Sequence, residues 1–294
     1  MLSSGMPWTD FELIVAVVAM SALTLLMYQV GCWYHAKSRL MEIAVFFGVT
    51  LVAFILAWSY FGRLIWAETI QSSSVLCWSN LTPIALGFSA GLASHTPGLR
   101  YRMRPVAALL LMLLAVGFVA TPIARPLFFP LSLDSSPKWQ NEVLMQSHRA
   151  SCAPAAAVTL LRQHGIIASE NELATACLSS QLGTAPLGLY RGLHLLADRH
   201  GFDAIVADKL PEGWLSKQQL PVAAIVQFEG LPGDRFQTQF LGNRFSGHVV
   251  TILGRTDGGR WMIGDPAVGR VSWSEQELQA RYCGEGIYLR RKSN

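Results

Sequence analysis

Long apolar runs fill the first half of the chain, and shorter runs that alternate with polar residues fill the second half. Each long run has about the 18–20 residues with which a helix crosses a hydrocarbon core near 30 Å thick. Backbone polar groups find no water inside a bilayer, so such runs are expected to be helical. The pattern therefore predicts four transmembrane helices, at about residues 13–30, 43–60, 75–93 and 106–123.

Polar residues and prolines within or beside these runs indicate what the helices do. The third run contains Asn80 and Pro83, so a re-entrant or interfacial segment is the alternative for it. No run has an ionisable group at its middle, which favours a membrane anchor over a transport path. Acids but no Lys or Arg precede the first run, unlike a signal peptide, so we expect it to be retained. Pro122, Pro126 and Pro130 are expected to break the last helix.

Basic residues in the short loops predict the orientation. Lys37 and Arg39 follow the first run, and Arg100, Arg102 and Arg104 follow the third. Under the positive-inside rule both loops are cytoplasmic. We therefore expect a multi-pass protein of the inner (cytoplasmic) membrane, with its C-terminal domain extracytoplasmic, and periplasmic in a Gram-negative cell. If the third run does not span, the C-terminal domain lies in the cytoplasm instead.

Charge separates the two halves of the chain. Residues 1–137 hold seven Lys/Arg and five Asp/Glu, whereas residues 138–294 hold sixteen and fourteen. We expect a transmembrane domain at 1–131, a linker at 132–137 and a water-soluble domain at 138–294. The net charge of +4 includes no polybasic stretch, so nucleic acid is not an expected partner.

The second half predicts helices first and strands afterwards. Helices are expected at 152–164, 170–178 and 188–200, with Ser151 as an N-cap and Ser169 with Glu172 as a capping box. A turn signal at residues 257–259 predicts a hairpin between 249–253 and 261–263. This order suggests an α+β domain. The expected strands are 203–207, 222–228, 249–254, 260–264 and 287–290.

Two residues could supply nucleophilic chemistry. Cys152 is predicted at a helix N-terminus, where the partial positive charge lowers a thiol pKa. The alternative is a buried, inert cysteine. His248 begins a predicted strand after Gly247 and could take the thiol proton; the alternative is an ordinary partly buried histidine. His148, four residues before Cys152, is a rival base.

Two further residues could assist them. Asp265 ends the predicted hairpin near His248 and could orient its ring as the third member of a triad, or simply open a turn before Pro266. Gln146 lies six residues before Cys152 and could donate to an oxyanion. Alone, it is only a polar residue before a helix.

The remaining cysteines offer no metal chemistry. No CxxC occurs, and no Cys/His spacing suggests a zinc site. Cys177 and Cys283 could form a disulfide outside the cytoplasm or stay as two thiols, and the sequence leaves both alternatives open.

Together these features resemble the C39 family of papain-like cysteine peptidases, specifically its C39-like branch. The resemblance covers about residues 140–291 and rests on Gln146 before CAPAAAVTLL, LPVAAIV, GHVVTILGR, WMIGDPAVGR and SEQEL. It implies a papain-like α+β fold, with Cys152 as nucleophile, His248 as general base, Asp265 as the orienting acid and Gln146 as the oxyanion donor. No metal or organic cofactor is implied.

The family's activity gives the expected function. C39 domains cleave leader peptides, typically after Gly-Gly or Gly-Ala, so we expect a membrane-bound cysteine peptidase acting on an exported peptide or small protein. Ser151 and Ala153 replace the Asp or Glu and the Gly that many members have, which puts the substrate in doubt. Without a Walker A motif the chain would depend on a separate export system. The alternatives are a catalytically idle domain that binds leaders, and an amidase or transpeptidase.

Overall fold

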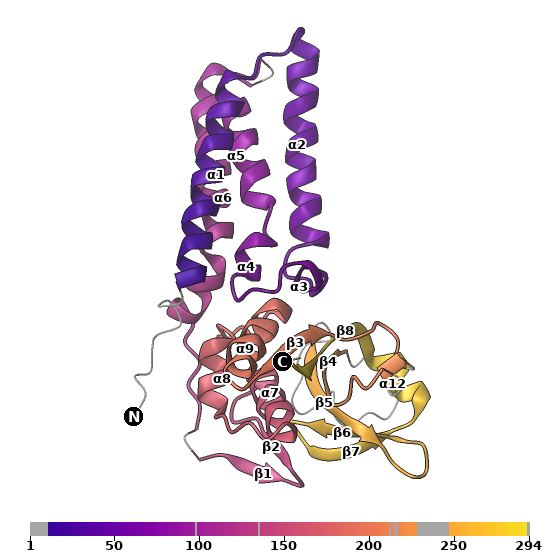
Figure 1. Cartoon of the computed structure of the whole chain (residues 1–294). Coiled ribbons are helices and arrows are strands. Elements are labelled where there is room, and N and C mark those ends of the chain that lie inside the picture. The colour runs from indigo at the N-terminus through magenta and orange to yellow at the C-terminus, as the bar shows by residue number, and fades with distance from the viewer. Residues whose placement is uncertain are drawn as a thin grey trace. The chain divides into compact units, whose positions relative to one another are not determined.

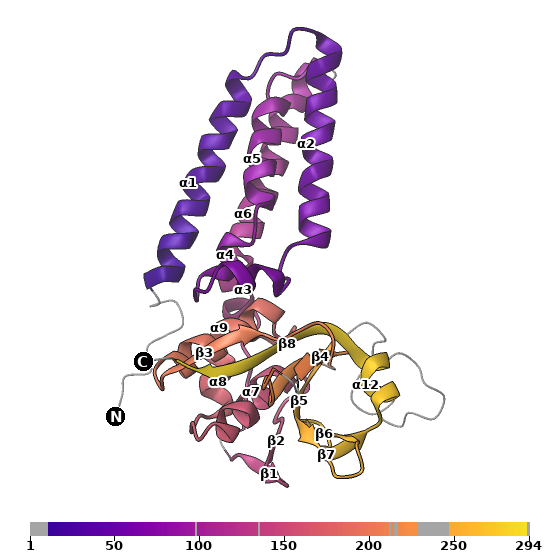
Figure 2. The same cartoon turned by 45° about the vertical axis from the view of Figure 1, so that its right-hand side comes forward.

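The computed structural model describes residues 11–97, 99–134, 136–211, 213–214, 217–227 and 247–292. By their contacts the described residues form two compact units. The first comprises the described parts of Met1–Arg63 and Ser74–Ala124, and the second those of Leu64–Ser73 and Arg125–Asn294. Figures 1 and 2 label the elements of each unit.

The first unit consists of apolar helices. Four helical stretches are long and apolar enough to cross a membrane: Phe11–Trp33, Arg39–Ser59, Val75–Ala93 and Tyr101–Phe128. The third is divided into two helices and is the most enclosed by its neighbours, which explains its lower mean hydropathy. The elements are α1 (Phe11–Trp33), α2 (Arg39–Ser59), α4 (Val75–Trp78), α5 (Thr82–Ala93), the short η2 (Tyr101–Met103) and α6 (Arg104–Phe128).

Glycines let α1 and α5 approach each other closely. A Cβ atom added at Gly91 would lie 2.2 Å from the carbonyl oxygen of Tyr28, and one added at Gly87 would lie 2.5 Å from that of Thr24. On the facing helix, a Cβ at Gly31 would lie 2.4 Å from the carbonyl oxygen of Phe88. Gly87 and Gly91 are four residues apart, the small-xxx-small spacing with which membrane helices bring their backbones together.

Asn80 repairs a backbone defect in α6. Pro122 has no N–H, so the carbonyl of Phe118, four residues earlier, lacks its usual helical partner. The Nδ2 of Asn80, at the break between α4 and α5, donates to that carbonyl at 2.9 Å. The prediction that Pro122 and Pro126 break the last helix is therefore wrong: α6 continues to Phe128, and Asn80 satisfies the group that Pro122 frees.

The second unit is an α+β domain, as predicted. Its longer sheet is antiparallel in the order β3-β8-β4-β5-β6-β7, and a separate two-stranded sheet pairs β1 with β2. The helices are α3 (Ile65–Thr69), α7 (Cys152–Gln163), α8 (Glu170–Ala176), α9 (Pro186–Asp198) and α12 (Glu275–Arg281). The strands are β1 (Lys138–Gln140), β2 (Val143–Met145), β3 (Phe202–Val206), β4 (Val222–Val226), β5 (His248–Arg255), β6 (Trp261–Asp265), β7 (Gly269–Trp273) and β8 (Tyr282–Arg291).

Helix α7 is the central helix of this unit and packs against β5, β4 and β6 as well as α8 and α9. Its run of small residues from Ala153 to Ala157 is buried and brings the helix close to the sheet. Thr251 of β5 donates to the carbonyl of Ala156 at 2.9 Å, and Thr159 accepts from the backbone N–H of Leu144 in β2 at 3.0 Å. These bonds fix α7 along its own axis, and hence the position of Cys152 at its first residue.

The sequence predictions of individual elements hold with small shifts at the ends. The β5–β6 hairpin is confirmed, with Thr251 paired to Gly264 and Arg255 to Trp261. The Ser169 cap is also confirmed, since its side chain accepts from the N–H of Glu172. Ser151, in contrast, makes no side-chain cap to α7. The sequence analysis missed β1, β2, β7, α3 and α12, and the residue expected to end β4, Phe228, lies outside the described residues.

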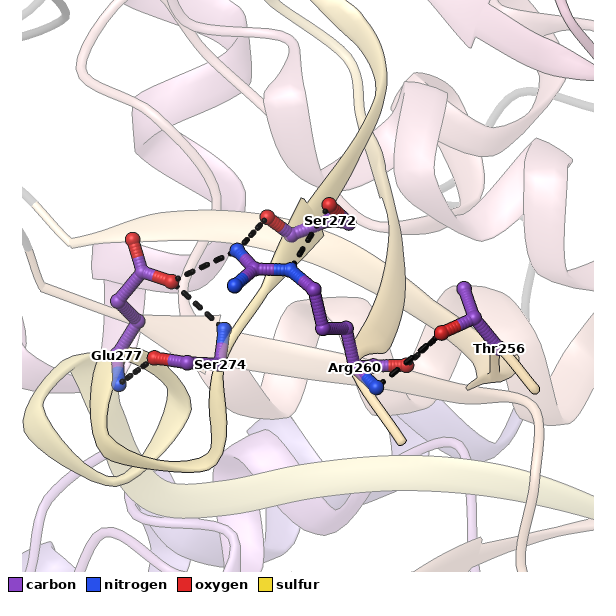
Figure 3. A network of polar contacts seen from close by, with 5 residues as sticks. All are labelled: Thr256, Arg260, Ser272, Ser274 and Glu277. Atoms are coloured by element: carbon purple, nitrogen blue, oxygen red, sulfur yellow. Dashed lines mark hydrogen bonds and ion pairs between the residues drawn. The ribbon is translucent and has the colours of Figure 1, made fainter. Parts of the chain in front are cut away.

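A polar network holds the start of β6 against α12 (Figure 3). Arg260 donates to the side chain and carbonyl of Ser272 at 3.2 and 2.9 Å and to Glu277 at 3.2 Å. Glu277 also accepts from the backbone N–H of Ser274, whose hydroxyl accepts from Glu277 N–H, forming a capping box. The network thus fixes the start of β6, whereas Asp265 lies at the other end of the strand.

The segment before the third apolar stretch packs with the C-terminal domain. Leu64 is fully buried, and its backbone N–H donates to the carboxylate of Glu285 in β8 at 3.2 Å. Ala67 of α3 is also buried, and α3 contacts β3. The second unit therefore contains residues from a loop that precedes its main sequence by more than fifty positions.

Candidate active site

Cys152 and His248 meet because each is the first residue of its element. Cys152 begins α7, and His248 begins β5, which packs against that helix. The two side chains interact: His248 lowers the pKa of the Cys152 thiol, and the backbone N–H groups of Val249 and Ala153 lower it further. Cys152 as a residue is partly exposed, whereas His248 is buried.

Asp265 holds the far side of the histidine ring. Its Oδ1 lies 2.8 Å from Nε2 of His248, and both side chains are buried. Continuing the Thr251–Gly264 register by one step places Asp265 opposite Val250, two residues from His248, so the two side chains share a face of the hairpin. The same Oδ1 accepts from the N–H of Ala267 at 2.9 Å. With Nε2 bound to Asp265, Nδ1 is left to face the thiol.

The electrostatics of this trio favour a thiolate–imidazolium pair. Burial alone would raise the pKa of the Cys152 thiol, but the hydrogen bond and charge of His248, with the two backbone N–H groups, lower it. Burial alone would lower the pKa of His248, but the hydrogen bonds to Asp265 and Cys152 outweigh it and raise it. The pKa of the Cys152 thiol is lowered and that of the His248 imidazole is raised, and both shifts favour transfer of the thiol proton to the ring.

Gln146 belongs to the loop that leads into α7. Its Nε2 donates to the carbonyl of His148 at 3.2 Å, and its Oε1 is buried with no hydrogen-bond partner among the described residues. Its backbone N–H donates to the carbonyl of Pro266, next to Asp265, at 2.8 Å. The structure therefore ties Gln146 to the neighbourhood of the trio. Its side-chain amide donates one proton to the His148 carbonyl, and the second proton is not used in that bond.

Ser151 closes the turn before the nucleophile instead of capping the helix. Its hydroxyl donates to the carbonyl of His148 at 2.8 Å and accepts from the N–H of the same residue at 3.1 Å. His148 in turn accepts from the N–H of Ala150 through Nδ1 at 3.1 Å, so that nitrogen is occupied within the turn. The carbonyl of His148 receives both Ser151 and Gln146, which links the residue before Cys152 to the amide of Gln146.

Glu170 is a further residue that the sequence analysis did not single out. It begins α8, is buried, and accepts from the backbone N–H of Ser147 at 3.1 Å. A buried carboxylate on a backbone N–H fixes the segment between Gln146 and Cys152. The sequence signal for it was the acidic first turn of the helix that Ser169 caps, which we interpreted only as a capping box.

The two other cysteines of this unit form no disulfide within the described residues. Cys177 is buried against α9, where a Cβ added at Gly192 would lie 2.2 Å from its sulfur. Burial raises the pKa of its thiol to about 12, which makes it unreactive at neutral pH. Cys283 is exposed in β8. The sequence left open a disulfide or two separate thiols, and the structure has two separate thiols.

An α+β domain in which a helix-terminal cysteine meets a histidine and an acid on a β-hairpin defines the papain-like class of peptidase fold. The Peptidase C39 family matches residues 140–294, more than half of the chain, and the chain therefore belongs to that family. No curated protein matches the chain.

Several solved structures are similar to this domain. A double glycine motif protease from an AMS/PCAT transporter, solved in complex with the leader peptide, is 17% identical, with 54% of this chain and 94% of that chain covered and a TM-score of 0.39. The peptidase domain of Streptococcus ComA, a bi-functional ABC transporter involved in quorum sensing, is 20% identical (52% and 100% covered, TM-score 0.39). The N-terminal peptidase C39 like domain of a toxin secretion ATP-binding protein from Vibrio parahaemolyticus is 15% identical (48% and 98% covered, TM-score 0.35).

Proposed function

We propose that this protein is a membrane-bound cysteine peptidase that removes a leader or pro-segment from an exported peptide or small protein. The observation that carries the proposal is the trio of Cys152, His248 and Asp265 within a Peptidase C39 domain. A domain that only binds leaders needs no thiol of lowered pKa beside a buried imidazole. The double-glycine type of cleavage site comes from the family resemblance.

The chemistry follows from the positions of the groups. The Cys152 thiolate attacks the scissile carbonyl carbon, and the oxyanion that forms accepts a hydrogen bond from the free amide proton of Gln146. The imidazolium of His248 then gives its proton to the departing amine, leaving a thioester on Cys152. A water that loses a proton to His248 hydrolyses the thioester and restores the thiolate–imidazolium pair. Asp265 holds the ring and stabilises its positive charge throughout.

The chain's path supports an extracytoplasmic position for the peptidase domain. Residues 64–73 pack on this domain, and the third and fourth apolar stretches lie between them and its main sequence. The chain therefore has to cross the membrane an even number of times between the two, which supports a spanning third stretch over a re-entrant one. With the basic first and third loops in the cytoplasm, the domain faces the opposite side.

Cleavage in membranes tests the proposal. The full chain is expressed with candidate secreted peptides that carry a double-glycine leader, and the peptide masses are measured for wild type, Cys152→Ala and Cys283→Ala. We expect the leader to be lost with wild type and with Cys283→Ala, which removes an exposed thiol outside the site. With Cys152→Ala the rate should fall by about 10⁴-fold or more.

The other outcomes identify the alternatives. Bound but uncleaved peptide in the presence of wild type would show a leader-binding domain and contradict the peptidase. A product joined to a second amine, in place of one hydrolysed by water, would show a transpeptidase. Cleavage that survives Cys152→Ala would remove the proposed nucleophile.

A further inference from the structure

Three side chains of the first unit, none of them part of the candidate active site, converge on one another. His35 follows α1, Glu42 lies in the first turn of α2, and His95 follows α5. One ligand atom from each lies within 4.8 Å of the others, and Nδ1 of His35 is 4.0 Å from Oε1 of Glu42. The three residues lie at the ends of three different helices, so this convergence is a product of the fold.

The hydrogen bonds of His95 fix its tautomer. Its Nε2 lies 2.9 Å from the carbonyl oxygen of Tyr34, which can only accept, so Nε2 carries the proton. In the neutral ring, Nδ1 then has the lone pair. Ser94 lies 3.4 Å from Nδ1 but donates its one hydroxyl proton to the carbonyl of Gly91 at 2.6 Å. Nδ1 therefore receives no proton from Ser94, and its lone pair is available to a cation.

The backbones that carry two of the three groups are fixed. The N–H of His95 donates to the carbonyl of Leu92 at 3.2 Å, at the end of α5, and that of Glu42 donates to Ser38 at 3.2 Å. Arg39 donates to the carbonyl of Pro97 at 2.8 Å, which joins the start of α2 to the segment that follows α5. His35 is largely exposed, at 72% of its side chain, and can turn toward the other two.

We propose that His35, Glu42 and His95 bind a divalent transition metal of the zinc class. Two imidazoles and one carboxylate are a ligand set that zinc takes, with water in the fourth position. The ring nitrogen of His95 that does not bind metal donates to a backbone carbonyl, the usual support of a metal-ligating histidine. Tetrahedral bonds of about 2.1 Å require ligand atoms about 3.4 Å apart. Binding the metal would therefore draw the three ligand atoms closer than their present separations of up to 4.8 Å, and the exposed His35 has room to turn.

The metal would cross-link the connection between α1 and α2 to the end of α5. Because it binds only where the three helices are assembled, it stabilises the first unit by mass action. The site takes no part in peptide cleavage, so it stands or falls independently of the proposed function.

Metal content of the purified full chain in detergent tests the proposal. The protein carries Cys152→Ala and Cys283→Ser, which leaves only the buried thiol of Cys177 in the other unit, and is stripped with EDTA and dialysed against Zn²⁺. We expect about one Zn²⁺ per chain by elemental analysis, a higher melting temperature with Zn²⁺, and visible absorption bands with Co²⁺. In the same background, His95→Ala and the isosteric Glu42→Gln should each abolish all three.

Replacing an exposed histidine of the other unit, His200→Ala, is the matched control and should leave the zinc content unchanged. Metal content no higher in the parent than in His95→Ala would overturn the proposal. A melting temperature that depends on pH but not on Zn²⁺ would also overturn it, because a proton shared by the cluster would then account for the stabilisation that we assign to the metal. If His95→Ala does not purify as a folded protein, Glu42→Gln decides alone.

Discussion

Hydrogen-bonding side chains are used differently in the two units. In the first, the hydroxyls of Thr24, Thr50 and Thr96 each donate to the carbonyl four residues back along the chain. In the second, Thr251 reaches a carbonyl 95 residues away, and His248 reaches Asp265 in the next strand. A helix that could span a membrane benefits from hydrogen bonds made along its own chain, because its surface can then pack by shape. The longer-range bonds of the second unit join distant segments and position the candidate chemistry.

The largest expected effect concerns Asp265, because the second unit uses this buried group for reactivity. Asp265→Ala removes both the orienting bond and the charge, and should lower the cleavage rate by about 10²-fold or more. Asp265→Asn keeps an acceptor for Nε2 of His248 but lacks the charge. We expect it to fall between Asp265→Ala and wild type.

The pH dependence separates orientation from charge. In wild type the pKa of Cys152 is lowered and that of His248 is raised, so the reactive pair forms below the ordinary thiol range and persists above 6.5, the ordinary imidazole value. Without the Asp265 carboxylate, the pKa of His248 falls, which narrows the active range from its upper side. The cleavage rate across pH measures this upper limit in wild type and in both variants. An unchanged upper limit in both variants would contradict the role of Asp265.

The next effect concerns shape in the first unit. Gly91→Leu places side-chain atoms against the backbone of α1, where a Cβ alone would lie 2.2 Å from the Tyr28 oxygen. We expect a loss of a few kcal/mol in stability. Gly117→Leu, in α6, is the matched control because a Cβ there meets nothing within 4 Å. Thermal unfolding in detergent measures both. Equal melting temperatures would show that the close contact of α1 and α5 contributes nothing.

The smallest effect concerns a long-range side-chain donor of the first unit, the Nδ2 of Asn80. Asn80→Leu leaves the carbonyl of Phe118 without its donor, at a cost of about 1 kcal/mol. Pro122→Ala restores a backbone N–H for the same carbonyl. In the double variant, the Asn80→Leu change should therefore cost less than it does alone. Strictly additive melting shifts in this double-mutant cycle would separate Asn80 from the proline defect.

Local signals in the sequence explain why the trio could be predicted. A helix start at Cys152, a strand start at His248 and a turn signal between paired strands fix where each side chain emerges. The surroundings could not be predicted in the same way. Ser151 has the chemistry of a helix cap, but its hydroxyl bonds with His148, a choice that depends on how the preceding loop folds. Gln146 likewise contacts a carbonyl that no periodicity identifies.

Long-range satisfaction accounts for what was missed in the first unit. The prolines of α6 would end an isolated helix, and only the packing of Asn80 beside them shows why this one continues. The His35, Glu42 and His95 cluster has no motif spacing because its members lie at the ends of three different helices. Sequence patterns report the neighbours of a residue along the chain, and these features depend on neighbours in space.

Burial of Leu64 and Ala67 has a practical consequence for anyone preparing the C39 domain alone. A fragment that starts at residue 132, where the apolar runs end, lacks residues 64–73, which belong to the same compact unit. The carboxylate of Glu285 loses the hydrogen bond that the backbone N–H of Leu64 donates to it, and the surface of β3 that contacts α3 becomes exposed to water. Such a fragment should be prone to aggregation, and adding residues 64–73 through a flexible linker should restore its solubility.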